Sequence, residues 1–150
     1  MEKLPIGRKD RIDIPAFEMK DIPVKIDSGA YSSSIHCKLV KEITQDNKKQ
    51  LEVIFLDESN KSFTGKAFYF DEYKTKKVKS STGHEQERFF IQLKIILFDR
   101  EFITDFSLTQ RNGLRHPILL GRKLTSKNFI IDTALTNLSY KNKLKTKLNT

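Results

Sequence analysis

The sequence predicts an all-β fold, and three observations lead to that prediction. Apolar residues alternate with a period of two along residues 88–97 and again along residues 101–108, as they do in half-buried strands. Short apolar runs follow one another closely and are separated by turns that contain Gly, Asn and Asp. No segment carries a sustained helical stripe of apolar residues. Together these features favour a barrel or a sandwich of short strands.

The expected elements follow one another in the order of the chain. A hairpin turn at Asp99-Arg100 is expected to join the two longest strands, and one short helix is expected within residues 122–126. The polar stretch 74–87 interrupts the pattern and is expected to be a long hairpin or a plain loop. Strands are predicted at residues 12–17, 24–26, 51–56, 62–70, 88–97, 101–108, 118–120 and 129–131.

Composition narrows the class of protein. The chain has 150 residues, of which 37% are hydrophobic and 31% charged, which suits one globular domain with its own core. No apolar run approaches the roughly 20 residues that cross a bilayer. The first residues do not resemble a signal peptide, so a cytoplasmic location without a membrane partner is expected. Cys37 is the only cysteine, and we expect it to be a small buried apolar group.

The charge is strongly positive and unevenly spread. A net charge of +9 favours an acidic partner such as a nucleic acid, an anionic surface or an acidic peptide. Lysines gather within residues 74–79 and again in the last ten residues. We therefore divide the chain into a single domain, 1–140, and a basic, flexible C-terminal tail, 141–150.

The stretch VKIDSGAYSSSIHC, residues 24–37, places a carboxylate directly after an apolar strand. Asp27, Ser28 and Gly29 are what half of an aspartic peptidase site requires, because the hydroxyl can lock the loop and glycine lets the backbone pass close to the carboxylate. Two such aspartates held together share one proton and can activate a water molecule. The same tripeptide is also ordinary turn chemistry, so by itself it leaves both interpretations open.

A second motif lies about ninety residues downstream, where the apolar strand of HPILLGR, residues 116–122, ends in Gly-Arg. With both motifs present, the chain resembles the retropepsin-like aspartic peptidases, and more closely the bacterial family labelled putative ATP-dependent zinc proteases. The resemblance spans residues 6–135. It is carried by Ile6-Gly7-Arg8, by Lys25 to Ala30 with Ser32, Ser33, Ser34 and His36, and by residues 108–132 including Arg115, Pro117, Leu120, Gly121 and Arg122.

The resemblance implies a closed or partly open β-barrel of the acid protease type with one short helix. It also implies a homodimer, because the mechanism needs two aspartates and the chain has one complete motif. Asp132, in Asp132-Thr133-Ala134, has Ala134 where glycine would be required, and we interpret Asp132 as structural. Asp27, Ser28 and Gly29 are then the expected catalytic group, one set from each chain.

The resemblance further implies that the stretch around 76–85 is the flap that closes over a substrate. An acidic, glutamate-rich peptide is the expected partner, since the relatives are associated with ATP-grasp ligases that add glutamate to proteins. Arg122 either braces the turn or helps to bind an acidic side chain, and its partner stays open because Tyr31 and Ser32 replace the usual acid. The expected substrate-binding residues are Ala30, Lys76, Lys77, Lys79, His84 and Arg122.

No cofactor or metal is expected, despite the family label. His36, His84 and His116 have no ligand-like spacing, and no phosphate-binding glycine loop is present. Adjacent strand residues point to opposite faces, so His36 and Cys37 are not expected to form a catalytic pair.

Two other functions are also compatible with the sequence. The first is a catalytically inactive retropepsin-like module that binds peptides or assists a ligase. The second is a basic nucleic-acid-binding β domain, which is less favoured because Phe89, Phe102 and Phe106 lie on faces that resemble core.

Overall fold

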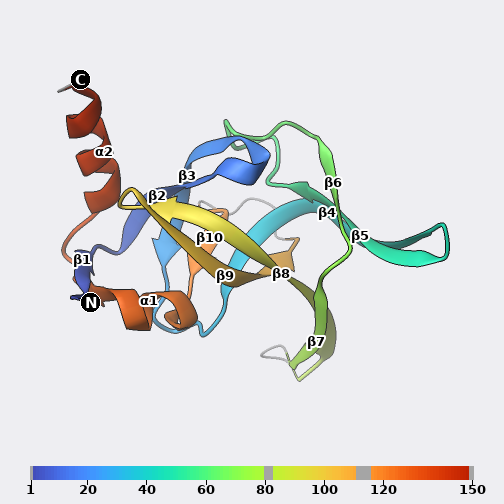
Figure 1. Ribbon diagram of the computed structural model, residues 1–150. Helices are drawn as coiled ribbons and strands as arrows, with labels where there is room; N and C mark the ends of the chain where they lie inside the picture. Colours follow the sequence, from blue (N-terminus) through green and yellow to red (C-terminus); the bar gives the residue numbers. More distant parts are fainter. Residues whose placement is uncertain (1, 80–82, 111–115, 149–150) are drawn as a thin grey trace.

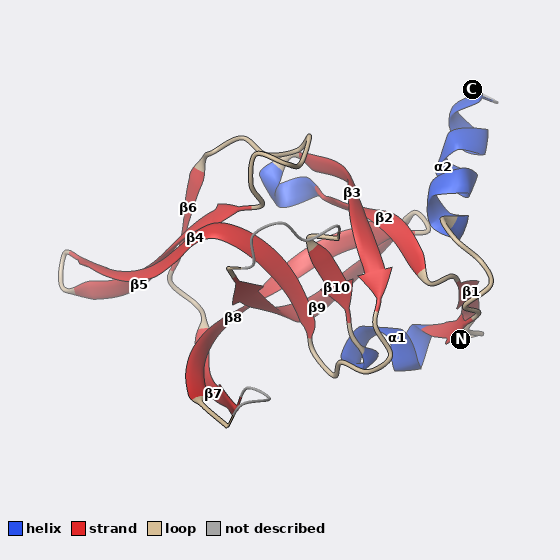
Figure 2. Cartoon of the chain, turned by 180° about the vertical axis from the view of Figure 1, so that it is seen from behind, coloured by secondary structure: helices blue, strands red, loops and turns tan. Residues whose placement is uncertain are grey.

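A computed structural model describes residues 2–79, 83–110 and 116–148. Strands dominate this part of the chain, which confirms the all-β prediction (Figure 1). Figure 2 shows that the two α-helices lie toward one end of the sheet, away from β5, β6 and β7. The strands are β1 (Leu4–Ile6), β2 (Lys9–Ile14), β3 (Met19–Ile26), β4 (Ser33–Gln45), β5 (Lys48–Phe55), β6 (Ala67–Phe70), β7 (Lys74–Lys79), β8 (Glu85–Leu97), β9 (Arg100–Thr109), β10 (Ile118–Leu120) and β11 (Phe129–Ile131). The helices are the 3-10 turn η1 (Pro15–Phe17), α1 (Arg122–Asn128) and α2 (Leu138–Leu148).

Six of the strands are connected in a closed ring of pairings. The order runs β10, β3, β2, β8, β9 and β4, and β10 pairs with β4 as well as with β3. The hairpin of β7 with β8 and the pair β5–β6 extend outward from this ring, while β1 and β11 form a small parallel sheet of their own. The short strand β10 is therefore held between the strand that precedes residue 27 and the strand that follows it.

The core fills the ring and follows from the alternation seen in the sequence. Ile91, Leu93, Ile95 and Leu97 on β8 are all buried, while Gln92 and Lys94 between them are exposed. β9 differs because Thr104 to Thr109 are buried without interruption, as expected for a strand covered on both faces.

Four local predictions need correction. The strand expected at 12–17 ends at Ile14, because Pro15 begins the 3-10 turn η1. The strand expected at 62–70 is confined to β6, because an irregular segment with turns at 57–60 and 61–62 precedes it. The 13-residue strand β4 was not predicted, because its serine, threonine and lysine residues interrupt the alternation of apolar and polar side chains. The hairpin turn lies at Phe98-Asp99 rather than at Asp99-Arg100, and both turn residues have positive φ (55° and 56°), as tight hairpin turns require.

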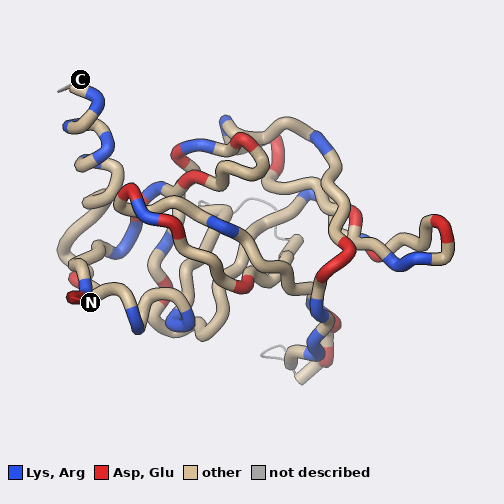
Figure 3. Tube along the Cα trace, in the orientation of Figure 1, with Lys and Arg blue, Asp and Glu red and all other residues tan. Residues whose placement is uncertain are grey.

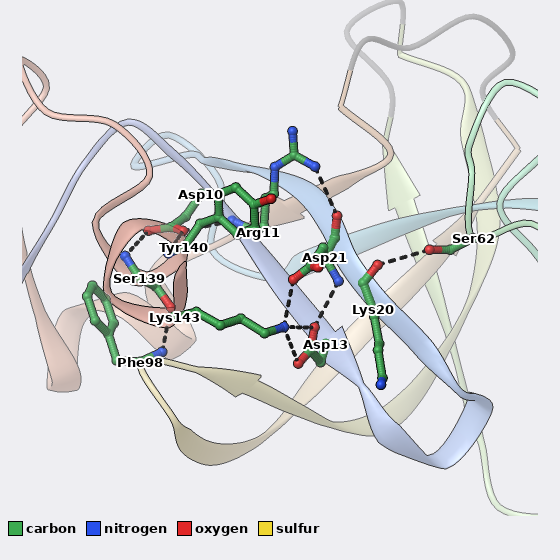
Figure 4. A network of polar contacts seen from close by, with 10 residues as sticks. All are labelled: Asp10, Arg11, Asp13, Lys20, Asp21, Ser62, Phe98, Ser139, Tyr140 and Lys143. Carbon is green, nitrogen blue, oxygen red and sulfur yellow. Dashed lines mark hydrogen bonds and ion pairs between the residues drawn. The ribbon is translucent and has the colours of Figure 1, made fainter. Parts of the chain in front are cut away.

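The expected flexible tail is helical through Leu148 and docks on the body of the domain (Figure 4). The buried carboxylate of Asp10 accepts hydrogen bonds from the backbone N–H groups of Ser139 (2.9 Å) and Tyr140 (3.1 Å) at the start of α2. Lys143, one turn further on, makes ion pairs with Asp13 (2.9 Å) and Asp21 (2.6 Å). The sequence did not indicate this docking, because the acidic partners lie more than 120 residues away along the chain. Two helices are present in place of the one expected.

Within the part of the chain that the structure describes, neither α1 nor α2 has the length and apolar character that crossing a membrane requires.

Candidate active site

Asp27 lies directly beyond the end of β3, where the strand ladder continues into the neighbouring strand β10. The backbone N–H of Asp27 donates to the carbonyl of Leu120 (2.9 Å), one step past the parallel pair of Ile26 with Leu120. Ile26 and Leu120 are buried, whereas Asp27 is half-buried. Strand β3 therefore leads from the core to the surface, and its backbone hydrogen bond fixes the position of Asp27 there.

The carboxylate of Asp27 accepts a hydrogen bond that closes the turn after this residue. The N–H of Gly29 donates to Asp27 Oδ1 (2.9 Å), and the N–H of Ala30 donates to the Asp27 carbonyl (3.3 Å). A Cβ atom at position 29 would lie 3.2 Å from the same Oδ1, closer than an ordinary contact. Glycine therefore allows the turn to approach the carboxylate. One oxygen of Asp27 is held in place by the backbone.

The segment Gly121 to Lys123, which belongs to the second motif, makes hydrogen bonds to this turn and to the start of β4. The N–H groups of Arg122 and Lys123 donate to the carbonyls of Ala30 (2.8 Å) and Tyr31 (2.9 Å). The N–H of Gly121 donates to the buried hydroxyl of Ser33 (3.1 Å). These bonds tie the start of α1 to the segment that follows Asp27.

Gly121 is required by this close approach. A Cβ atom at position 121 would lie 2.6 Å from the Tyr31 carbonyl oxygen and 2.7 Å from the backbone of Ser32. Both neighbours are main-chain atoms, so any larger residue would push the two segments apart.

The partner of Arg122, which the sequence left open, is the backbone of the turn. Arg122 Nη1 donates to the carbonyl of Ser28 (2.9 Å), and its guanidinium carbon lies 6.0 Å from the centroid of the Tyr31 ring. The guanidinium thus fixes the Ser28–Gly29 peptide group, whose N–H donates to Asp27 Oδ1.

The structure brings Asp27, Ser28, Gly29, Ala30 and Arg122 together in this turn. The other predicted substrate-binding residues lie on the hairpin of β7 and β8, which projects at the same lower edge of Figure 1 as the turn before β4.

On this hairpin, Lys76 lies opposite Arg88 and Lys77 opposite Glu87. His84 is exposed just before β8. Lys79 ends β7, and its side chain lies outside the described part. The role of these residues over a substrate stays a prediction.

Two charged residues that the sequence interpretation missed lie beside the turn. Asp105 is buried on β9 and makes an ion pair with Lys123, the residue that follows Arg122. The hydrogen bond from Lys123 is the main reason why the pKa of Asp105 is lowered, and the same bond raises the pKa of Lys123. A charged residue within the apolar alternation of 101–108 was the signal that could have drawn attention to Asp105.

His36 and Cys37 are both buried on β4 but have separate environments. His36 Nε2 lies 2.8 Å from Asp57 Oδ2. Hydrogen bonds from Ser59 lower the pKa of Asp57, with His36 as a smaller cause. The Cys37 thiol lies 3.7 Å from the carbonyl of Ile35, and burial raises its pKa, so it is a buried neutral group.

Asp132 takes part in a turn at the small sheet of β1 and β11. Its N–H donates to the carbonyl of Ile6 (2.9 Å), and its Oδ1 accepts from the N–H of Ala134 (3.0 Å). These bonds agree with the structural interpretation of Asp132. Among residues 2–79, 83–110 and 116–148, no three His, Cys, Asp or Glu side chains are grouped so as to hold a metal ion.

Two curated relatives are longer proteins that are named as probable ligases. A "Probable alpha-L-glutamate ligase" of Shewanella pealeana is 26% identical over 133 residues, which cover 87% of this chain and 28% of the relative. The relative of the same name in Desulfotalea psychrophila is 26% identical over 132 residues, again 28% of its length. The chain thus spans less than a third of the curated relatives that it matches.

A solved structure and a family model match most of the chain. A crystal structure of a protein of unknown function from Legionella pneumophila superposes with a TM-score of 0.70 and 25% identity, covering 92% of this chain and 99% of that one. The model of the RimB-like family, described as "Retropepsin-like aspartic endopeptidase RimB", matches residues 6–142. On this evidence the chain belongs to the RimB-like family.

Proposed function

We propose that this protein is an aspartic endopeptidase that hydrolyses peptide bonds with two Asp27 carboxylates, one from each chain of a homodimer. The observation that carries the proposal is the half-buried Asp27 at the end of β3, with one oxygen bonded to the Gly29 N–H (2.9 Å). The Gly121-Arg122 segment braces the same turn, which is the arrangement that a rigid carboxylate needs.

The chemistry follows from bringing two such carboxylates together. Like charges a few ångströms apart cannot both ionise, so the pair shares one proton and titrates as a unit. The ionised member removes a proton from a water molecule as its oxygen attacks the peptide carbonyl carbon. The protonated member gives its proton to the carbonyl oxygen, which forms a gem-diol. When the C–N bond breaks, the leaving amine receives the proton taken from water, and a hydroxyl proton of the gem-diol returns to the other carboxylate. The hydrogen bond from Gly29 keeps the Asp27 side chain in one orientation throughout.

The proposed substrate is an acidic, glutamate-rich peptide or protein segment. The net charge of +9 supports this class because it attracts acidic chains. The hairpin of β7 and β8 contributes lysines, which are interspersed with acidic residues (Figure 3). The relatives named glutamate ligases support an association with an ATP-grasp enzyme that attaches glutamate. Lys76, Lys77, Lys79 and His84 are the groups proposed to face the substrate.

Replacing the proposed catalytic carboxylate tests the function. Asp27→Asn keeps the size of the side chain and its acceptor for Gly29 but removes the charge. We expect cleavage of a fluorogenic glutamate-rich peptide to fall by roughly 10²–10⁴-fold. Asp132→Asn is the matched control, because Asp132 also follows a strand and caps a turn, and it should keep its activity. Cleavage that survives Asp27→Asn would exclude Asp27 from the reaction.

A second candidate is a peptide-binding partner of a glutamate ligase that does not cleave. It is favoured by the names of the relatives, in which this domain fills 28% of a longer chain. Under this alternative the wild-type protein and Asp27→Asn bind the acidic peptide equally well, and neither cleaves it.

A further inference from the structure

The start of helix α1 holds the segment after Asp27 through its backbone. The N–H of Arg122 donates to the carbonyl of Ala30 (2.8 Å). The N–H of Lys123 donates to the carbonyl of Tyr31 (2.9 Å). A helix of seven residues has little stability of its own, so the position of these N–H groups depends on what holds α1 against the sheet. A contact that fixes the start of α1 therefore also fixes the turn.

One such contact is the ion pair between α1 and the neighbouring strand β9. The ammonium of Lys123 is bonded to Oδ2 of the buried Asp105, and α1 packs beside both β9 and β4. In the parallel ladder of β4 and β9, Phe106 pairs with Ser33. Asp105, one residue earlier on β9, therefore lies beside the end of the segment that begins at Asp27. The ion pair connects this strand to the helix that holds the same segment.

The carboxylate of Asp105 is held in a fixed position. Strand β9 pairs with β8 on one side and with β4 on the other, so its backbone cannot shift alone. The hydrogen bond from Lys123 is the main cause of the lowered pKa of Asp105, with smaller contributions from Lys74 on β7 and from Gln92, its cross-strand neighbour on β8. Of these three partners, Lys123 is the one that comes from α1. The ion pair thus ties α1 to a carboxylate that the sheet already holds.

The pair matters for the place of the turn rather than for its shape. The bonds from Gly29 and Ala30 back to Asp27 close within the turn and do not involve Lys123. The orientation of the whole turn relative to the strands depends on α1. In the proposed reaction two such turns must place their carboxylates close together, and a misplacement of about 1 Å can lower a rate by about a hundredfold.

We propose that Asp105 is a positioning residue for the reaction: through Lys123 it fixes α1, and α1 fixes the turn that carries Asp27. The inference rests on the proposed function and adds to it a residue that acts through another side chain rather than by contact with the substrate.

A double-mutant cycle on the cleavage rate tests the role of the pair. Asp105→Asn removes the charge at nearly constant shape, and Lys123→Met removes the ammonium. We expect each change to lower kcat on the glutamate-rich peptide by about tenfold and to leave KM within about twofold, because misplaced carboxylates affect the reaction more than binding. The double variant should lose no more than either single variant, since all three lack the same contact. Lys123→Arg keeps the pair and should retain kcat.

Ile14→Val is the control for a general loss of stability. Ile14 is fully buried and pairs with Met19, at the end of β3 opposite to Asp27. The change costs about 0.5–1.5 kcal/mol, which is the size of the loss expected for Asp105→Asn, and it should leave kcat unchanged. An equal fall in kcat in this control, additive losses in the double variant, or an unchanged kcat in Asp105→Asn would overturn the inference.

Amide hydrogen exchange separates this inference from the peptidase itself. In Asp105→Asn the N–H groups of Arg122 and Lys123 should exchange about fivefold faster relative to those of β8, and Ile14→Val should leave this ratio unchanged. A fall in kcat without faster exchange at these two positions would also overturn the inference. If the wild-type protein cleaves nothing while the ratio rises, the peptidase fails and the connection from Asp105 to the turn stands. If it cleaves while kcat and the ratio ignore Asp105, the positioning role fails and the peptidase stands.

Discussion

The charge of Asp105 is stabilised by a partner from another element. A carboxylate on a strand buried from Thr104 to Thr109 would be costly without a partner. Lys123 supplies that partner from α1, and its hydrogen bond is the main cause that lowers the pKa of Asp105 below the ordinary value of 3.8. The same contact joins β9 to the segment that braces the turn at Asp27.

This pKa shift predicts a pH dependence of stability. Because the folded carboxylate binds a proton less readily than the unfolded one, its stabilising effect is complete above the unfolded pKa. That effect is lost as the pH falls through the lower folded value. Asp105→Asn should therefore reduce the free energy of unfolding by about 1 kcal/mol at pH 7 and flatten its decline below pH ~4. Urea unfolding at pH 7 and in acid measures both effects.

The control for Asp105 is Asp99→Asn, which removes an exposed carboxylate at a turn position with φ of 56° that asparagine tolerates. Identical acid profiles for the two variants would contradict the role assigned to the Asp105–Lys123 pair.

Among the elements, helix α2 shows how a polar helix can be held by hydrogen bonds and ion pairs in its first two turns rather than by an apolar stripe. Asp10 receives backbone N–H groups from Ser139, Tyr140 and Arg11, and the Ser139 hydroxyl accepts from the N–H of Phe98 (2.7 Å). Lys143 then bridges Asp13 and Asp21 on the β2–β3 hairpin. These bonds compensate for the small apolar contact of the helix.

Removing the cap should loosen the whole element. Asp10→Ala leaves the first N–H groups of α2 without their acceptor, and we expect it to reduce the free energy of unfolding by about 1–2 kcal/mol. Amide hydrogen exchange within residues 139–148 should accelerate more than exchange in β8. Asp10→Asn is the matched control, since it keeps an acceptor oxygen. Burial raises the pKa of Asp10, so the neutral variant also avoids the cost of burying a charge. Equal loss in both variants would contradict the capping role.

At the scale of the whole molecule, the central question is the number of chains in one site. A single chain carries one Asp-Ser-Gly turn, and Asp132, which also follows a strand, is engaged in a turn of its own. The proposed chemistry therefore needs a second copy that places its Asp27 opposite the first.

Mixing experiments can count the carboxylates. When wild-type and Asp27→Asn chains are unfolded together in equal amounts and refolded, only pairs of two wild-type chains carry both aspartates. Activity should then be about one quarter of that of the same total amount of wild-type protein, rather than one half. Asp132→Asn chains serve as the mixing control and should leave activity unchanged. A residual activity of one half would indicate that each chain works alone.

The sequence alone was sufficient for features that depend on neighbouring residues. The alternation along 88–97 predicted β8 because side chains on a strand point to opposite faces. The Asp-Ser-Gly turn could be recognised because its bonds, from Gly29 and Ala30 back to Asp27, close within three residues. The pairing of the two motifs also indicated the family.

Only the tertiary structure decided which distant groups meet. The partner of Arg122 is a carbonyl 94 residues away in the sequence, and the cap of α2 comes from a carboxylate 129 residues away. Local patterns contain no information on such contacts, because they depend on how the ring of strands brings separate segments together. The same reason hid the Asp105–Lys123 pair, because a half-exposed lysine and a buried carboxylate meet only when α1 packs beside β9.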